Sequence, residues 1–211
     1  MITKRDIVTQ IIGKAKVCQN TKASAFAPAN IALIKYWGKR NSELNLPVTN
    51  SLSLSLSLGT HTNLQIASKD SCVLNGTECA PDAPFTKRLF SFVDLFRTPD
   101  TYFHIDTKNE VPTAAGFASS SSGFAALILA LNSLYGWQKE PKELSILARL
   151  GSGSASRSLF SGFVEWQSGT RDDGMDSYST ALTDTWPELS LGLIMVSDKE
   201  KPIDSRRAMQ N

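Results

Sequence analysis

The chain has 211 residues, of which 41% are hydrophobic and 20% charged, a composition typical of a globular protein with one large domain. Its 22 basic and 20 acidic residues nearly balance, which argues against a dedicated nucleic-acid-binding protein. No apolar run is long enough to span a membrane, and polar residues interrupt any signal-peptide core. Three cysteines without a CxxC pair favour a reducing, cytoplasmic location, and two isolated histidines argue against a zinc site.

The first half of the chain is predicted to be one helix followed by strands. Apolar residues at helical spacing predict the helix over residues 3–18. Serine and leucine alternate from residue 51 to 58, as in a strand with one apolar and one polar face. Asn75-Gly76 is a favourable two-residue hairpin turn. The predicted strands are residues 24–27, 51–58, 61–67, 72–74 and 77–79, with a further apolar stretch over residues 31–37.

In the second half, helices and strands are mixed. The predicted helices are residues 85–96, 124–135 and 141–150, with helix starts over 154–160 and 203–210, and the predicted strands are residues 102–107, 163–167 and 189–196. Strands that come first, with helices mixed in later, favour an α+β fold over a regular α/β fold. The chain stops soon after the last predicted helix begins, so we expect a fragment of a longer protein.

A loop of small residues, 111–123, leads into the helix predicted over 124–135. Gly116 can adopt a positive φ, and its small neighbours let a ligand approach the backbone closely. The serines at 119–122 stand where a helix N-cap belongs, and the unpaired N–H groups of a first turn suit a phosphate. No Gly-Lys-Ser/Thr closes the loop, so it is not a Walker A loop. Taken alone, the loop favours a phosphate site and an ordinary capped helix about equally.

Three segments together resemble one enzyme family. They are PANIALIKYWGKR at 28–40, VPTAAGFASSSSG at 111–123 and GSGSASRSL at 151–159. Their order and spacing, together with LNLP at 44–47, DGMDS at 173–177 and VSD at 196–198, are similar to the diphosphomevalonate decarboxylase family of the GHMP kinase superfamily. The resemblance runs from about Ser24 to the end of the chain and covers the larger, N-terminal part of the family's length.

The resemblance implies a fold, a reaction and cofactors. Residues 23–196 would form a GHMP kinase-like N-terminal domain of the ribosomal protein S5 domain 2-like fold, between an N-terminal helical extension at 1–22 and the start of a truncated C-terminal domain at 197–211. The reaction would be ATP-dependent decarboxylation of mevalonate 5-diphosphate to isopentenyl diphosphate, through phosphorylation of the 3-hydroxyl, in isoprenoid biosynthesis. ATP and Mg²⁺ would be required. The protein would be a cytoplasmic homodimer without a nucleic-acid or membrane partner.

The resemblance also assigns site residues. Arg157 would orient the substrate carboxylate, because its planar fork can bind a carboxylate through two hydrogen bonds. Lys35 would stabilise charge on the transferred phosphoryl group or on the substrate, so both residues are predicted to be catalytic. The predicted substrate-binding residues are Tyr36, Lys39, Ser152, Ser154 and Arg157. The predicted ATP-binding residues are Ala114, Ala115, Gly116, Ser119, Ser120 and Ser121, with Ser120 also a candidate magnesium ligand.

Alternatives stay open from the sequence. Arg157 could be a solvated surface residue, the serines could serve only turns and caps, and Asn45 could hydrogen-bond either the nucleotide or a loop carbonyl. The family's catalytic aspartate belongs to an Asp-Ala-Gly-Pro-Asn type of motif that these residues lack. A catalytically incomplete nucleotide-binding fragment is therefore one alternative function. A related GHMP enzyme acting on mevalonate or a mevalonate monophosphate is another.

Overall fold

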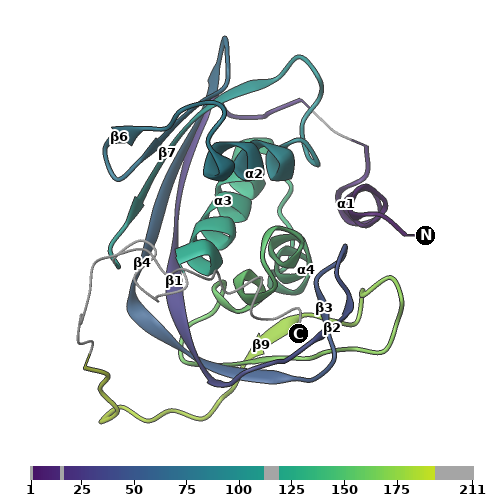
Figure 1. Cartoon of the computed structure of the whole chain (residues 1–211), viewed down its shortest axis with the longest axis vertical. Coiled ribbons are helices and arrows are strands. Elements are labelled where there is room, and N and C mark those ends of the chain that lie inside the picture. The colour runs from purple at the N-terminus through teal and green to yellow at the C-terminus, as the bar shows by residue number, and fades with distance from the viewer. Residues whose placement is uncertain (1, 15–16, 112–118, 193–211) are drawn as a thin grey trace.

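The computed structural model describes residues 2–14, 17–111 and 119–192. A seven-stranded sheet carries helices on one face (Figure 1), so the predicted α+β fold is confirmed. The helices are α1 (Lys4–Ile12), α2 (Pro84–Val93), α3 (Ser119–Tyr135) and α4 (Pro141–Gly151), followed by a 3-10 helix, η1 (Gly153–Arg157). The sheet strands are β1 (Lys22–Ile34), β4 (Ser51–Ala67), β5 (Ser71–Leu74), β6 (Thr77–Glu78), β7 (Tyr102–Asn109), β8 (Phe163–Trp166) and β9 (Ser179–Ala181). Strands β2 (Lys39–Asn41) and β3 (Leu46–Pro47) form a separate hairpin.

Strand β4 organises the sheet. It pairs along its length with β1, while its first residues pair with β8 and its last with β7, giving the order β6-β5-β7-β4-β8-β9. The predicted alternation over 51–58 holds at its start, because Ser51 and Ser53 are buried on the helix side while Leu52 and Leu54 are only partly buried. The polar face of this strand therefore points toward η1.

In two places, a pair of predicted segments forms one continuous strand. Residues 51–58 and 61–67 join into β4 through Gly59, where a Cβ atom would overlap the carbonyl oxygen of Ala27 on β1. Glycine at this position lets the two strands pass closely, so it marks a close approach and not a turn. The predicted strand 24–27 and the first part of the apolar stretch 31–37 likewise join into β1, which ends at Ile34 and shifts register between Pro28 and Asn30.

Several predicted boundaries were wrong. The first helix ends at Ile12 and not at 18, because Gly13 adopts a φ of 76°. Helix α3 begins at Ser119, so the serine run forms its first turn, and the segment after Gly153 is a 3-10 helix. The structure adds β9, and residues 189–192 form no strand. The other predicted segments, 193–196, 197–211 and 203–210, lie outside the described residues, so the domain boundary at 197 stays a prediction.

The core lies between the sheet and α2, α3 and α4. Helix α3 is buried on nearly every side: Ala125, Ala126, Leu127, Ile128, Ala130, Leu131 and Leu134 are at most 1% exposed. A helix that is apolar all round is a core helix, and its packing fixes where its N-terminus points. Among the helices of the described residues, none is long and apolar enough to cross a membrane.

Candidate active site

Arg157, at the end of η1, is a buried cation. Its side chain is 3% exposed, so the surface-arginine alternative is wrong. Nη1 donates to Ser51 Oγ at 2.6 Å and Nη2 donates to Asn30 Oδ1 at 3.3 Å, and within the described residues no carboxylate pairs with it. Burial lowers the pKa of the guanidinium to about 10, against the opposing effect of Tyr36, so it stays protonated at neutral pH. A buried cation held by neutral acceptors suits an anionic ligand.

An indole forms one wall of this cluster. The Trp166 ring lies edge-on to Tyr36, with centroids 4.8 Å apart, and its centroid is 5.7 Å from the Arg157 guanidinium carbon. At Gly153, an added Cβ would lie 2.9 Å from the Tyr36 hydroxyl and 3.0 Å from Trp166 Cη2. The glycine loop can approach these rings only because Gly153 has no side chain. The structure therefore brings Tyr36 and Arg157 together around Trp166.

The predicted substrate serines lie on the same short segment. Ser152 Oγ and Ser154 Oγ are 3.3 Å apart, and both side chains are half-buried. Asn30 fixes the segment from β1, because its Nδ2 donates to Ser158 Oγ at 2.7 Å and to the Ser154 carbonyl oxygen at 3.3 Å. One asparagine thus holds both the glycine loop and the Arg157 side chain.

The two predicted lysines differ in their surroundings. Lys35 is exposed, and within the described ranges its ammonium has no hydrogen-bond or ion-pair partner. Lys39 Nζ donates to Asn45 Oδ1 at 2.9 Å. Asn45 Nδ2 in turn donates to the carbonyl oxygens of Arg149 and Leu150, which belong to the end of helix α4 and not to a loop. Lys39 and Asn45 thereby tie the β2–β3 hairpin to the helix that precedes the glycine loop.

The start of α3 lies beside a small cavity. Ser120 is exposed and lines a cavity of about 110 Å³ between α2, α3 and the sheet, together with Arg88 and Phe124. Ser121 and Ser122 are fully buried, and Ser122 Oγ lies 2.7 Å from Thr60 Oγ1. Ser119 begins the helix, and the predicted ATP-binding residues Ala114, Ala115 and Gly116 lie outside the described residues.

Arg88 connects this cavity to the glycine loop. Its Nη2 donates to the carbonyl oxygen of Gly151 at 3.0 Å, and its guanidinium carbon lies 4.8 Å from the Phe124 ring centroid. The Arg88 side chain on helix α2 therefore contacts both helix α3 and Gly151, the last residue of α4. A lone arginine on an amphipathic helix gives no signal in the sequence, so Arg88 was not among the predicted site residues.

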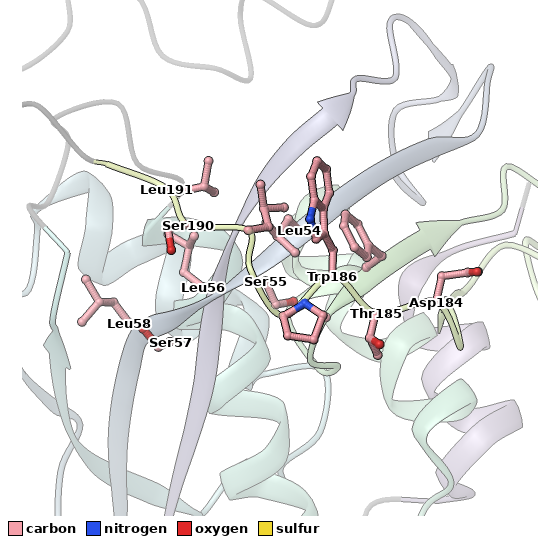
Figure 2. A pocket seen from close by; sticks show the side chains of 14 residues that line it. Leu54, Ser55, Leu56, Ser57, Leu58, Asp184, Thr185, Trp186, Ser190 and Leu191 are labelled. Carbon is pink, nitrogen blue, oxygen red and sulfur yellow. The ribbon is translucent and has the colours of Figure 1, made fainter.

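A groove of about 550 Å³ lies elsewhere in the described part of the chain. Leucines of β4 and the segment 184–191 face it (Figure 2). Its labelled lining residues are Leu54, Ser55, Leu56, Ser57, Leu58, Asp184, Thr185, Trp186, Ser190 and Leu191. None of the predicted site residues lines this groove, so it is separate from the Arg157 cluster.

A family model described as the diphosphomevalonate decarboxylase-like N-terminal domain matches residues 27–179. The chain belongs to this family. The diphosphomevalonate decarboxylase of Candida albicans is 43% identical over 208 residues, which covers 90% of this chain and 58% of that protein. The chain therefore spans little more than half the length of this curated relative.

Solved structures of the diphosphomevalonate decarboxylase family have the same fold. Mevalonate diphosphate decarboxylase from Staphylococcus aureus superposes with a TM-score of 0.76 at 36% identity, covering 90% of this chain and 59% of that one. A structure described as MDDEF in complex with MVAPP, AMPPCP and magnesium superposes with a TM-score of 0.73 at 37% identity, covering 90% and 60%.

Proposed function

We propose that the protein carrying this chain catalyses the ATP-dependent decarboxylation of mevalonate 5-diphosphate to isopentenyl diphosphate. The observation that carries the proposal is the buried Arg157 cation of a chain from this family, which is held by two neutral acceptors, Ser51 on β4 and Asn30 on β1. A buried charge is costly unless it is paired, and a substrate carboxylate would pair with it through two hydrogen bonds.

The chemistry explains the need for such a cation. The 3-hydroxyl oxygen attacks the γ-phosphorus of ATP and ADP leaves, which converts a poor leaving group into phosphate. The C3–O bond then breaks, phosphate leaves, and the C1–C2 electron pair forms the C2=C3 double bond as carbon dioxide departs. Arg157 holds the carboxylate in line for this loss. The base for the hydroxyl proton would be the aspartate of the family's Asp-Ala-Gly-Pro-Asn type of motif, which these 211 residues lack.

The other proposed roles concern two polyanions. Lys35, with its exposed ammonium, neutralises charge on the phosphoryl group or on the substrate. Lys39, Ser152 and Ser154 bind the substrate on its diphosphate side, and Tyr36 packs beside the substrate or hydrogen-bonds to it. Residues Ala114, Ala115, Gly116, Ser119, Ser120 and Ser121 bind the ATP phosphates, and the three serines belong to the first turn of α3.

The described residues fit a magnesium ion that is shared with phosphates. Ser120 offers an exposed oxygen beside the cavity, and among the described residues no three His, Cys, Asp or Glu side chains cluster as a cage. Mg²⁺ is usually held by one or two protein oxygens plus substrate phosphates, and the proposed ligand here is the Ser120 hydroxyl. When bound, the ion would neutralise phosphate charge.

The test is an assay of ADP release by the intact gene product. Mevalonate 5-diphosphate, mevalonate 5-phosphate and mevalonate are offered side by side with ATP and Mg²⁺, and isopentenyl diphosphate is quantified. We expect turnover with the diphosphate and release of one ADP per isopentenyl diphosphate. A preference for mevalonate or its monophosphate would move the protein to a related activity, and nucleotide binding without turnover would make it a non-catalytic binder.

We also propose a cytoplasmic homodimer. Cys18, Cys72 and Cys79 are all free thiols, as expected in a reducing compartment, while the dimer rests on the family resemblance alone. Light scattering on the purified intact protein and fractionation of cells test the two proposals separately.

A further inference from the structure

The segment 173–177 carries part of the family resemblance, but the proposed function gives it no role. Its last residue, Ser177, is fully buried next to the candidate site. Trp166 Nε1 donates to Ser177 Oγ at 3.2 Å, and Ser177 Oγ donates to the Gln167 carbonyl oxygen at 3.0 Å. The hydroxyl therefore acts as acceptor and donor at once, which fixes its orientation.

Arg149 holds the segment from the other side. This fully buried side chain on α4 donates through Nη1 to the carbonyl oxygens of Gly174, at 2.8 Å, and Ser177. Gly174 has a φ of 66°, and an added Cβ there would overlap Leu46 Cδ2. Burial, reinforced by Arg40, lowers the pKa of Arg149 to about 9, which still leaves it protonated at neutral pH. The segment is thus pinned between α4 and the β2–β3 hairpin.

The indole that Ser177 holds touches the candidate site on its other side. Trp166 is completely buried, and its ring lies against Tyr36 and Arg157. The same ring lies so close to Gly153 that a Cβ atom added there would be 3.0 Å from Cη2. Rotation of a buried indole would leave its N–H without an acceptor, which is costly, so one hydrogen bond sets the ring plane. The ring plane in turn sets the space that is left for the Tyr36 ring and the Arg157 guanidinium.

We propose that Ser177 is a positioning residue of the active site, which acts through the Trp166 indole on Tyr36 and Arg157. The inference rests on the proposed function. Three successive contacts support it: Arg149 with Ser177, Ser177 with Trp166, and Trp166 with Arg157. Each of them is a hydrogen bond or a ring contact. Loss of the Ser177 hydroxyl should change the turnover of bound substrate and leave ATP binding alone.

A double-mutant cycle on the intact protein tests this. We expect Ser177→Ala to lower kcat for mevalonate 5-diphosphate about tenfold with an unchanged KM for ATP. Trp166→Phe lacks the indole N–H, so adding Ser177→Ala to it should cost little more, and the two effects should be strongly non-additive. Val93→Ala, in the buried core at the end of α2, controls for general loss of stability. Wild-type kcat in Ser177→Ala, additive effects, or an equal loss in Val93→Ala would overturn the proposal.

A spectroscopic arm needs no turnover. Protein labelled with 5-fluorotryptophan is followed by ¹⁹F NMR, and Trp166→Phe assigns the Trp166 resonance. We expect Ser177→Ala to shift this resonance and Val93→Ala to leave it in place. If the wild-type protein does not convert mevalonate 5-diphosphate, the proposed function fails. The positioning of Trp166 by Ser177 then stands or falls on this resonance, and an unmoved signal in Ser177→Ala would refute it.

Discussion

The hydroxyl of Ser51 accepts a hydrogen bond from Arg157 Nη1 at 2.6 Å, so the central strand of the sheet holds the guanidinium that ends η1. With Asn30 on the neighbouring strand, Ser51 leaves the guanidinium oriented but not neutralised. This arrangement gives Arg157 a fixed direction before any ligand binds, and pre-organisation of that kind lowers the cost of binding.

Replacing Arg157 should affect the substrate and not the nucleotide. Two charge-assisted hydrogen bonds are worth on the order of 3–6 kcal/mol, so Arg157→Ala should lower kcat/KM for mevalonate 5-diphosphate about 10²–10⁴-fold. Arg157→Lys keeps the charge but not the fork, so it should recover little. Steady-state kinetics and nucleotide titration of the intact protein measure both quantities. Arg5→Ala, an exposed arginine on α1, is the control, and near-wild-type turnover in Arg157→Ala would remove this residue from the active site.

Ser51 offers a sharper comparison with its neighbour on the same face. Ser51→Ala removes the acceptor of a buried charged group and should lower kcat/KM for the substrate by about tenfold to a hundredfold. Ser53 is equally buried, and its hydroxyl has no hydrogen-bond partner among the described residues. Ser53→Ala should therefore leave kcat/KM near the wild-type value. Equal kinetics in the two variants would show that the Ser51 contact does not orient Arg157.

The sequence predicted the segments of the site but not the contacts between them. The glycine loop and Arg157 were recognisable locally, whereas Ser51 lies 106 residues away and becomes a partner only through the register of β4. The regular serine–leucine pattern showed that one face of β4 is polar, without showing what that face meets. Trp166 looked like an ordinary strand residue, because nothing local marks an indole whose N–H binds Ser177. The strands predicted over 51–58 and 61–67 are one strand, because Gly59 continues β4 where it passes close to β1.

Ser120 should contribute to nucleotide use more than to folding. Its side chain is exposed in the first turn of α3, so Ser120→Ala should change the free energy of unfolding by at most about 0.5 kcal/mol. Loss of a phosphate or magnesium oxygen should raise the KM for ATP or lower kcat about tenfold, which corresponds to about 1.4 kcal/mol. Kinetics over a range of ATP and Mg²⁺ concentrations measure this. An unchanged KM and kcat would make Ser120 a bystander at the helix start.

Two glycines at helical positions should respond in opposite directions to alanine. At Gly151 the new Cβ would overlap the Phe124 ring, so Gly151→Ala should destabilise the fold by roughly 1–3 kcal/mol. At Gly123 in α3, nothing lies within 4 Å of the new Cβ, so Gly123→Ala should stabilise the helix by up to about 1 kcal/mol. Urea unfolding followed by circular dichroism decides the sign of each. Stabilisation by Gly151→Ala would contradict the packing of α4 against Phe124.

Glu110 should make stability depend on acid pH. Its Oε2 accepts the Gly59 N–H at 2.8 Å and its Oε1 lies 3.1 Å from His61 Nε2, and these contacts lower the pKa of the carboxyl from its ordinary value of 4.5. A carboxyl with a lowered folded-state pKa stabilises the fold above its ordinary pKa, and this contribution is lost as the pH falls through the folded-state value.

Glu110→Gln keeps the size and an acceptor but removes the charge. The Tm of this variant should therefore lie below the wild-type Tm at neutral pH, and the difference should shrink between about pH 5 and about pH 3. Glu78→Gln, an exposed residue on β6, controls for a general change of net charge. Thermal melts of the three proteins across that range measure the effect, and a wild-type-to-Gln difference that stays constant with pH would show that the Glu110 carboxylate contributes nothing through its ionisation.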